Sequence, residues 1–236
     1  MLSRGLISAR YLLILTLAVF LPMALPLQAH AFSRYIAQPK QVASAVDNPA
    51  LAKPKKVRTV WPWAPFSDRQ GAYPIIGHRT FGGKEWLRLN LPGRPNGLTG
   101  WVLAERVKQV PSYWSIRVDI SNRSLAIWQR GKLVKRILVV VGAPSTPTPR
   151  GHFFIEDKVR IEQSWARGGW GLATSAYSDV LRHFEGGQGQ IAIHTRGSLS
   201  APMGTAASHG CIRVPASFAW WLARVVPPGT PLDIVR

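Results

Sequence analysis

Cys211 carries the most nucleophilic side chain of this sequence, and it is the only cysteine among 236 residues. A lone cysteine cannot form an internal disulfide, and it excludes a zinc site built from several cysteines. Ser208, His209 and Gly210 come directly before it, and Arg213 follows shortly after. Because Gly210 has no side chain, a substrate carbonyl and backbone N–H donors can approach the sulfur. The segment therefore suits attack on a carbonyl carbon.

Two histidines are candidates to take the proton from this thiol. His209 is a close neighbour in the sequence, and His194 ends a predicted strand whose following loop can return to the sulfur. A thiol with an imidazole base is the smallest set that performs nucleophilic acyl transfer. Cys211 also precedes a predicted helix, and N–H groups at a helix N-terminus would favour the thiolate.

Two other interpretations of Cys211 stay open on the residues alone. Free cysteines are often buried and inert, which would make it a core residue. A zinc ion could instead be held by His194 and His209 with either Cys211 or His152, although no pair of histidines has metalloprotease spacing. The flanking histidine, glycine and arginine favour a nucleophile.

The charge of the chain indicates an anionic partner. Lysine and arginine number 30 against 11 acidic residues, which gives a net charge of +19. Such a surface attracts anionic polymers. Among the acidic residues, Glu156, Asp157 and Glu162 would be the candidates for a glycan hydrolase, but their context predicts ordinary surface charge. Hydrophobic residues make up 46% of the chain, which excludes a mainly disordered protein.

Residues 1–31 predict export. Arg4 and Arg10 precede an apolar run over 11–27, which ends near the small-x-small pattern at 29–31. This is typical of a signal peptide, with an uncleaved N-terminal anchor as the alternative. We therefore expect the rest of the chain in the periplasm or cell wall, where its partners are anionic cell-wall polymers and not nucleic acid. Membrane contact is expected only if the segment stays attached.

Two further segments precede the cysteine-containing part. Residues 32–58 are rich in alanine, proline and lysine, which predicts a basic linker. Residues 59–110 alternate short apolar runs with turn signals, which predicts a small β-barrel. The segment WLRLNLPGRPNGLTGWV (86–102) resembles a bacterial SH3-like domain. This unit has no catalytic set of residues.

Residues 112–236 form a second unit that is predicted to be mainly β. Residues 115–120 alternate polar and apolar side chains, as a half-buried strand does. Apolar residues at helical spacing predict one short helix over Pro215–Val226, which the following Pro-Pro-Gly stops. Further strands are predicted at 125–128, 133–141, 151–155, 190–194 and 232–235.

Three segments of this unit carry a resemblance to a known family. IAIHTRGSL (191–199) and MGTAASHGCIRV (203–214) resemble the active-site signature of the L,D-transpeptidases, the YkuD domain. PTPRGHFFI (147–155) is similar to the family's Pro-Thr-Pro-x-Gly-x-Phe stretch. Thr195 stands where many members have glycine. The resemblance covers about 113–236 and implies a YkuD-type β-sandwich with one short helix after the catalytic cysteine, preceded by the SH3-like β-barrel.

The resemblance implies a role for each residue of the signature. Cys211 would be the nucleophile, and His194 would be its base, oriented by the backbone carbonyl of Thr195. The N–H groups of Gly210 and Cys211 would form the oxyanion hole. His209 would shape and polarise the substrate site.

The remaining signature residues and the substrate are implied in the same way. Ser208 and Arg213 would support the loop and contact substrate carboxylates. The enzyme would attack tetrapeptide stems of peptidoglycan, release D-alanine and form 3→3 cross-links, without a metal or organic cofactor. The open alternatives are an L,D-carboxypeptidase that uses water as the acceptor, attachment of proteins to peptidoglycan, and a non-catalytic wall-binding protein that acts through the SH3-like unit.

Overall fold

The computed structural model describes residues 35–161, 169–197 and 200–236. Strands dominate this part of the chain, and its single α-helix is α1 (Ala216–Val225). The mainly β fold and the helix predicted over Pro215–Val226 are therefore confirmed. The expected signal peptide over 1–31 and Glu162 lie outside the described residues. No helix in the described ranges is long and apolar enough to cross a membrane.

The N-terminal part of the described chain forms a seven-stranded sheet with the order β3-β2-β6-β5-β4-β1-β7. A short 3-10 helix, η1 (Ala104–Arg106), precedes its last strand. The strands of this sheet are β1 (Tyr35–Pro39), β2 (Ala43–Val46), β3 (Lys56–Val60), β4 (Tyr73–Phe81), β5 (Lys84–Asn90), β6 (Thr99–Leu103) and β7 (Val107–Pro111).

The linker predicted over 32–58 is wrong for the described residues, because β1, β2 and most of β3 lie within it. Ala37 and Ala45 are fully buried in the core of this sheet, together with Leu87 and Leu89. Alanines that fill a core give a weak apolar signal in the sequence, and lysines between them suggest solvent. The sheet therefore begins well before the expected boundary at residue 59. Its SH3-like identity stays a prediction.

The second part forms an eight-stranded sheet with the order β10-β9-β8-β17-β12-β13-β14-β16 and a separate parallel pair of β11 with β15. The strands predicted at 115–120, 125–128, 151–155, 190–194 and 232–235 occur, although β12 extends further than expected. The single strand predicted over 133–141 is wrong in its extent, because β10 ends at Leu138 and Val141 belongs to the separate pair of β11 with β15. The strands are β8 (Trp114–Asp119), β9 (Ser124–Gln129), β10 (Lys132–Leu138), β11 (Val141–Gly142), β12 (Gly151–Ile161), β13 (Gly169–Tyr177), β14 (Gln190–Thr195), β15 (Ala206–Ser208), β16 (Ile212–Val214) and β17 (Pro231–Val235).

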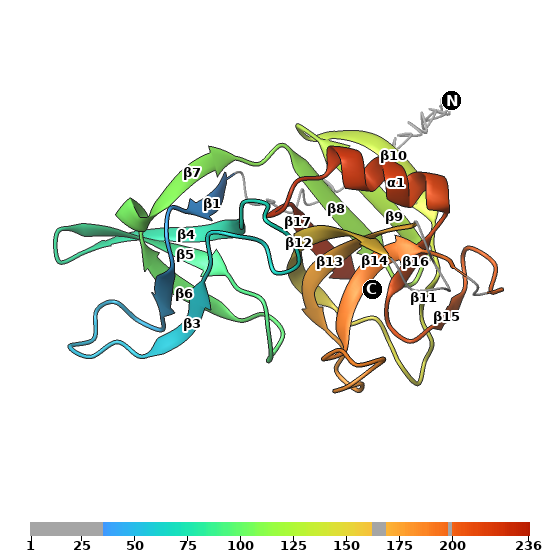
Figure 1. Ribbon diagram of the computed structural model, residues 1–236, viewed down its shortest axis with the longest axis horizontal. Helices are drawn as coiled ribbons and strands as arrows, with labels where there is room; N and C mark the ends of the chain where they lie inside the picture. Colours follow the sequence, from blue (N-terminus) through green and yellow to red (C-terminus); the bar gives the residue numbers. More distant parts are fainter. Residues whose placement is uncertain (1–34, 162–168, 198–199) are drawn as a thin grey trace, which may run out of the picture. The chain divides into compact units, whose positions relative to one another are not determined.

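Helix α1 covers part of the eight-stranded sheet, where it packs on β13 and β14 (Figure 1). It buries Phe218, Ala219, Leu222 and Ala223, which lie three or four positions apart along one face. These side chains belong to the same apolar core as Ile193 of β14. The helix therefore fixes the strand that ends in His194 and Thr195.

Strand β12 contributes to two cores, because neighbouring side chains along a strand point to opposite faces. Phe153 and Ile155 lie in the core of the eight-stranded sheet. Phe154 is 1% exposed and lies in the core of the seven-stranded sheet, with its ring centroid 5.9 Å from that of Tyr73. Asn90 of β5 adds a hydrogen bond from Nδ2 to the His152 carbonyl oxygen at 2.9 Å. Both sheets thus belong to one compact unit.

Candidate active site

Cys211 lies in a tight turn between β15 and β16. Gly210 has a φ of +116°, a conformation that side-chain-bearing residues rarely adopt. The Ser208 hydroxyl closes the turn, since it donates to the Cys211 carbonyl oxygen at 2.6 Å and accepts the Gly210 N–H at 3.2 Å. The Gly210 N–H is therefore already used inside the turn, which is at odds with the oxyanion role expected of it.

A second loop holds this turn from outside. Thr148 donates from Oγ1 to the Gly210 carbonyl oxygen at 2.8 Å and accepts the Gly142 N–H at 2.8 Å. Thr146 donates to the Ser208 carbonyl oxygen at 3.0 Å. Both threonines belong to the proline-rich stretch 144–149. That stretch therefore fixes the backbone on which the thiol sits.

His194 is brought to the cysteine by a parallel strand pair. Strand β14 pairs with β16 so that His194 is opposite Arg213 and Ile193 is opposite Ile212. His194 is buried, and this burial together with the Arg213 charge lowers its pKa to about 3, while a hydrogen bond with the Thr195 backbone acts in the opposite direction. The imidazole is therefore neutral at pH 7 and able to accept a proton.

Burial has the opposite effect on the thiol. It raises the pKa of Cys211, while a hydrogen bond with the Ala192 backbone and the Arg213 charge lower it. Its Sγ lies 4.0 Å from the Gln190 carbonyl oxygen. The resting pair is thus a thiol and a neutral imidazole, and attack requires transfer of the thiol proton.

The thiolate expected from a helix N-terminus is not supported. Helix α1 begins only at Ala216, and strand β16 separates it from Cys211. The effect of a helix dipole falls off beyond the first turn. Arg213, whose guanidinium donates to the Arg196 carbonyl oxygen at 3.1 Å, is the cation whose charge favours the thiolate.

Cys211, His194, His209, Ser208 and Arg213 all line one cavity of about 620 Å³. The other signature residues, Gly210 and Thr195, are buried behind it. The ring of His209 is exposed and stacks on a phenylalanine of the facing loop, with 5.0 Å between the ring centroids. The structure therefore places all of the sequence-predicted site residues in or directly behind one cavity.

The facing wall of this cavity is a loop over 178–189, which was not predicted from the sequence. Leu181, Phe184 and Glu185 line the cavity from this loop. Gly189 has a φ of +68°, and a Cβ there would lie 1.9 Å from the Leu181 carbonyl oxygen, so the loop closes tightly on itself. Its glycines gave a turn signal in the sequence, but nothing there connected them to the cysteine.

Two residues between β5 and β6 of the seven-stranded sheet hold this loop. Arg94 donates from Nη2 to the carbonyl oxygens of Ser178 at 2.8 Å and Leu181 at 3.1 Å. Asn96 donates from Nδ2 to the Tyr177 carbonyl oxygen at 2.7 Å and accepts the Tyr177 N–H at 2.9 Å. Asn96, which lies in one of the turns between the apolar runs of residues 59–110, thus serves a contact with the end of β13, directly before this loop. The N-terminal sheet supports one wall of the candidate site.

The surface-charge prediction for Glu156 and Asp157 is wrong, because both are buried. Burial raises the pKa of Glu156 to about 8, against the Arg58 charge and a hydrogen bond from Gln190. That bond, from Gln190 Nε2 to Glu156 Oε2, measures 2.6 Å. The Asp157 carboxylate accepts hydrogen bonds from Phe66 and Ser67, in a loop of the seven-stranded sheet. The partners lie too far along the chain for the sequence to indicate them.

The described residues hold no group of three or more histidine, cysteine, aspartate or glutamate side chains that could bind a metal ion. His152, a candidate ligand in the zinc alternative, instead has its Nδ1 at 2.8 Å from Asp233 Oδ1.

A family model of the L,D-transpeptidase catalytic domain matches residues 114–234, which is just over half of the chain. The chain belongs to this family. This member of the L,D-transpeptidase family is 32% identical over 121 residues to YkuD of Bacillus licheniformis, a protein that is named as an L,D-transpeptidase. That match covers 51% of this chain and 65% of the relative, so it spans slightly less than two thirds of the relative's length.

Solved structures of other L,D-transpeptidases are also similar to it. The enzyme from Mycobacterium smegmatis is 16% identical with a TM-score of 0.45, over 85% of this chain and 99% of that one. The catalytic domain from the Enterococcus faecium enzyme is 26% identical with a TM-score of 0.37, over 51% and 95%. Membership of the family follows from the family-model match over residues 114–234 and not from these structures.

Proposed function

We propose that this L,D-transpeptidase family member cross-links peptidoglycan through a thioester on Cys211. The donor is a tetrapeptide stem, and the acceptor is the amine of a second stem, which gives a 3→3 cross-link. One observation carries the proposal: the thiol of Cys211 and the neutral imidazole of His194 line the same cavity, which has room for a peptide. The family match supports the same chemistry.

In the acylation half, His194 takes the proton from Cys211 as the sulfur attacks the carbonyl carbon of the L-centre of the diamino acid. The carbonyl oxygen becomes an oxyanion. When this intermediate collapses, the C–N bond to the terminal D-alanine breaks, and the imidazolium gives its proton to the leaving amine. D-Alanine departs, and the tripeptide remains as a thioester.

In the second half, the acceptor amine attacks the thioester carbon and transfers a proton to His194. The C–S bond breaks, and the sulfur recovers its proton from the imidazolium. The product is a new amide between two stems. No step requires a redox partner, because acyl transfer between nitrogen and sulfur changes no oxidation state.

Backbone donors and Arg213 complete the proposed site. The Gly210 N–H already donates to Ser208 Oγ, so the Cys211 N–H is the proposed oxyanion donor of the turn. Arg213 favours the thiolate through its charge, and we propose that it pairs with a stem carboxylate, because it lines the cavity. Ser208 acts on the turn and not on the substrate, because both of its contacts are to the turn backbone.

The proposed place of action is the periplasm or cell wall. It rests on the signal-like pattern over 1–31 and on the net charge of +19, which suits anionic wall polymers. Peptidoglycan stems are accessible only outside the cytoplasmic membrane. Export and substrate are thus two parts of one proposal.

The test is incubation of the purified protein with a disaccharide tetrapeptide, followed by mass analysis of the products. A cross-linked dimer is the expected result. A tripeptide alone would replace transfer with hydrolysis by water, and unchanged substrate would favour a wall-binding protein. Cys211→Ala should abolish formation of the products, because it removes only the nucleophile. Ser217→Ala, at an exposed position of α1, should still form them.

A further inference from the structure

A second cavity, of about 760 Å³, shares no lining residue with the cavity around Cys211. Strand β3 contributes Lys56 and Arg58 to it, and the segment after that strand contributes Trp61 and Trp63. Glu156 of β12 lines it from the eight-stranded sheet. Cations, aromatic rings and one carboxyl group therefore meet in a cavity that the proposed transfer chemistry does not use.

Arg58 has a cationic group without an acidic partner. Its Nε is buried without a hydrogen-bond partner, and it forms no ion pair with any described carboxylate. The guanidinium is held in place by close packing, because a Cβ at Gly93 would lie 2.1 Å from Nη2. Arg58 as a whole is only partly buried and lines the cavity, so its guanidinium is available to pair with an anion bound there.

Glu156 does not neutralise this cation. It lines the cavity from β12, on the same side of the strand as Phe154, because alternate side chains of a strand share a face. With a pKa of about 8, it is mostly protonated at neutral pH. The cavity then carries the positive charges of Lys56 and Arg58 together with a neutral carboxyl that can exchange hydrogen bonds with hydroxyl groups.

Trp61 and Trp63 form an exposed aromatic platform beside these charges. They are 44% and 51% exposed, and their ring centroids lie 5.3 Å apart. The backbone beneath them is fixed: the Trp61 N–H donates to Tyr73 Oη at 3.1 Å, and Gly71 fits so closely that a Cβ would lie 2.6 Å from the Trp61 carbonyl oxygen. Two large apolar rings are thus held toward solvent on a fixed backbone.

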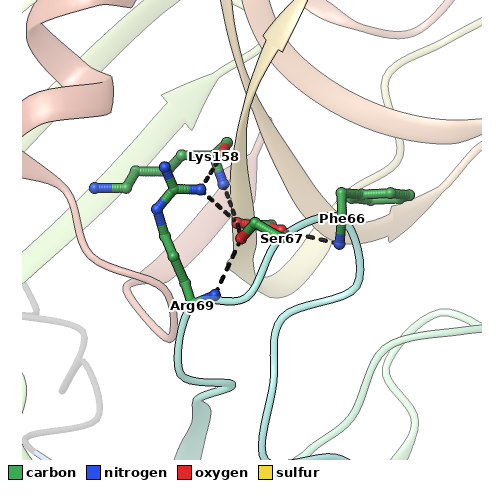
Figure 2. Close-up of polar contacts among 5 residues, drawn as sticks. Phe66, Ser67, Arg69 and Lys158 are labelled. Atoms are coloured by element: carbon green, nitrogen blue, oxygen red, sulfur yellow. Dashed lines mark hydrogen bonds and ion pairs between the residues drawn. The ribbon is translucent and has the colours of Figure 1, made fainter.

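Asp157 fastens the loop that carries this platform to β12. Its carboxylate is fully buried and accepts the Phe66 N–H at 2.9 Å, the Ser67 hydroxyl at 2.8 Å and Arg69 Nη1 at 3.4 Å (Figure 2). Asp157 directly follows Glu156, so one strand fixes both the platform loop and the carboxyl of the cavity. Such preorganisation lowers the entropic cost of binding a ligand.

We propose that this cavity binds a carboxylate-bearing saccharide. The guanidinium of Arg58, with Lys56, pairs with the carboxylate. The apolar face of a sugar ring packs on Trp61 and Trp63, and the ring hydroxyls exchange hydrogen bonds with Glu156. The cavity shares no residue with the thiol site, so this binding goes beyond the proposed transfer reaction and tethers the protein to a polymer independently of it.

The test is calorimetric titration of the purified full chain with four probes. Two carry carboxylates on sugar rings: tetragalacturonate, and peptidoglycan strands freed of their stems by an amidase, whose muramic acids have free lactyl carboxylates. Chitotetraose supplies rings without charge, and polyphosphate supplies charge without rings. Binding of either carboxylated probe, clearly tighter than that of the other two, is expected, and the tighter of the pair identifies the natural source.

Variants connect the binding to the cavity. Arg58→Ala and the double change Trp61→Ala with Trp63→Ala should each weaken binding about tenfold or more, the effect of losing a charge-assisted hydrogen bond or a stacked ring. Trp220→Ala is the matched control, because Trp220 is 50% exposed on α1 outside the cavity. Arg58→Lys keeps the charge but lacks the planar guanidinium, so it should bind the saccharide with intermediate affinity. This variant tests the role of Arg58 if Arg58→Ala fails to fold.

Three results would overturn the proposal. These are equal affinity for chitotetraose, binding of the carboxylated saccharides that is unaffected by loss of the two tryptophans, and loss of affinity in Trp220→Ala equal to that in the double variant. Cys211→Ala should bind the saccharide like the unchanged protein. The two proposals can therefore fail separately. The protein could bind the saccharide without cross-linking stems, or cross-link stems without binding the saccharide.

Discussion

Arg94 Nη2 donates to the carbonyl oxygen of Ser178 at 2.8 Å, although the two residues lie in loops that connect strands of different sheets. The same guanidinium lies 5.0 Å from the centroid of the Tyr177 ring, which precedes the loop over 178–189. Together with Asn96, this side chain from the loop between β5 and β6 thus holds one wall of the Cys211 cavity. The N-terminal sheet contributes to the shape of the substrate site without touching the reacting atoms.

Arg94→Ala should lower kcat/KM for the tetrapeptide about tenfold, mainly through a higher KM, because the loop loses its fixed position. Hydrogen exchange should rise over 178–189 and stay unchanged at the cysteine turn. Arg79→Ala is the control, since Arg79 is exposed on β4 and its guanidinium lies 5.8 Å from the centroid of the Trp101 ring. Unchanged kinetics and exchange in Arg94→Ala would remove this positioning role.

His194→Ala should reduce turnover by about 10²–10⁴, the usual contribution of a general base. Burial raises the pKa of Cys211, and this variant lacks the imidazole proposed to accept the thiol proton, so alkylation should require more alkaline conditions than in the unchanged protein. His209→Ala should cause a smaller loss, since His209 is exposed at the cavity mouth. The measurement is turnover together with iodoacetamide reactivity against pH. A larger effect at His209 would transfer the base role to that residue.

Glu156→Gln should change how stability depends on pH. The folded chain keeps the Glu156 proton up to a pKa of about 8, whereas the unfolded chain loses it near the ordinary value of 4.5. Between these values the folded state binds more protons, so its stability falls as pH rises.

In the unchanged protein, the free energy of unfolding should therefore fall across this window by an amount on the order of a few kcal/mol. Glutamine cannot titrate, so Glu156→Gln should flatten the fall. Urea unfolding at a series of pH values measures it, with Glu85→Gln at an exposed position as the control. Parallel curves for the Glu156 variant and the unchanged protein would contradict a buried, protonated Glu156.

Meropenem should add once to each chain, at Cys211. A β-lactam carbonyl is a strained acyl donor, and the single thiol beside His194 should open it to a thioester. Intact mass followed by peptide mapping measures the adduct, and Cys211→Ala should show none. A missing adduct while iodoacetamide still alkylates the thiol would mean that the cavity does not admit this acyl donor.

The sequence predicted the candidate site better than its surroundings, because the signature residues are close along the chain. Ser208, Gly210 and Cys211 share one turn, and His194 ends a strand with a clear pattern. The thiolate prediction failed because proximity to a helix in the sequence did not give proximity in space. The Gly210 N–H was expected in the oxyanion hole, but it donates to the Ser208 hydroxyl instead. This contact depends on the rotamer of Ser208, which composition and spacing do not reveal.

The missed strands have a physical reason in common. Strand β13 contains GWGLATSAY, whose small residues are mostly buried, so polar and apolar positions do not alternate. Strands β1 and β2 depend on pairing with β7, β4, β3 and β6, which are partly distant in sequence. Asp157 has partners about 90 residues away in the chain. Local patterns cannot report such contacts.

The two-sided burial of β12 has a consequence for how this architecture can change in evolution. Exchange of the N-terminal sheet for an unrelated module would leave Phe154 facing water and Asp157 as a carboxylate without donors. A new N-terminal module would have to supply an apolar contact surface for Phe154 and hydrogen-bond donors for Asp157 at the same time. Otherwise, β12 itself would have to change first. The boundary near residue 112 is therefore a poor site for module shuffling, even though the family match begins at 114.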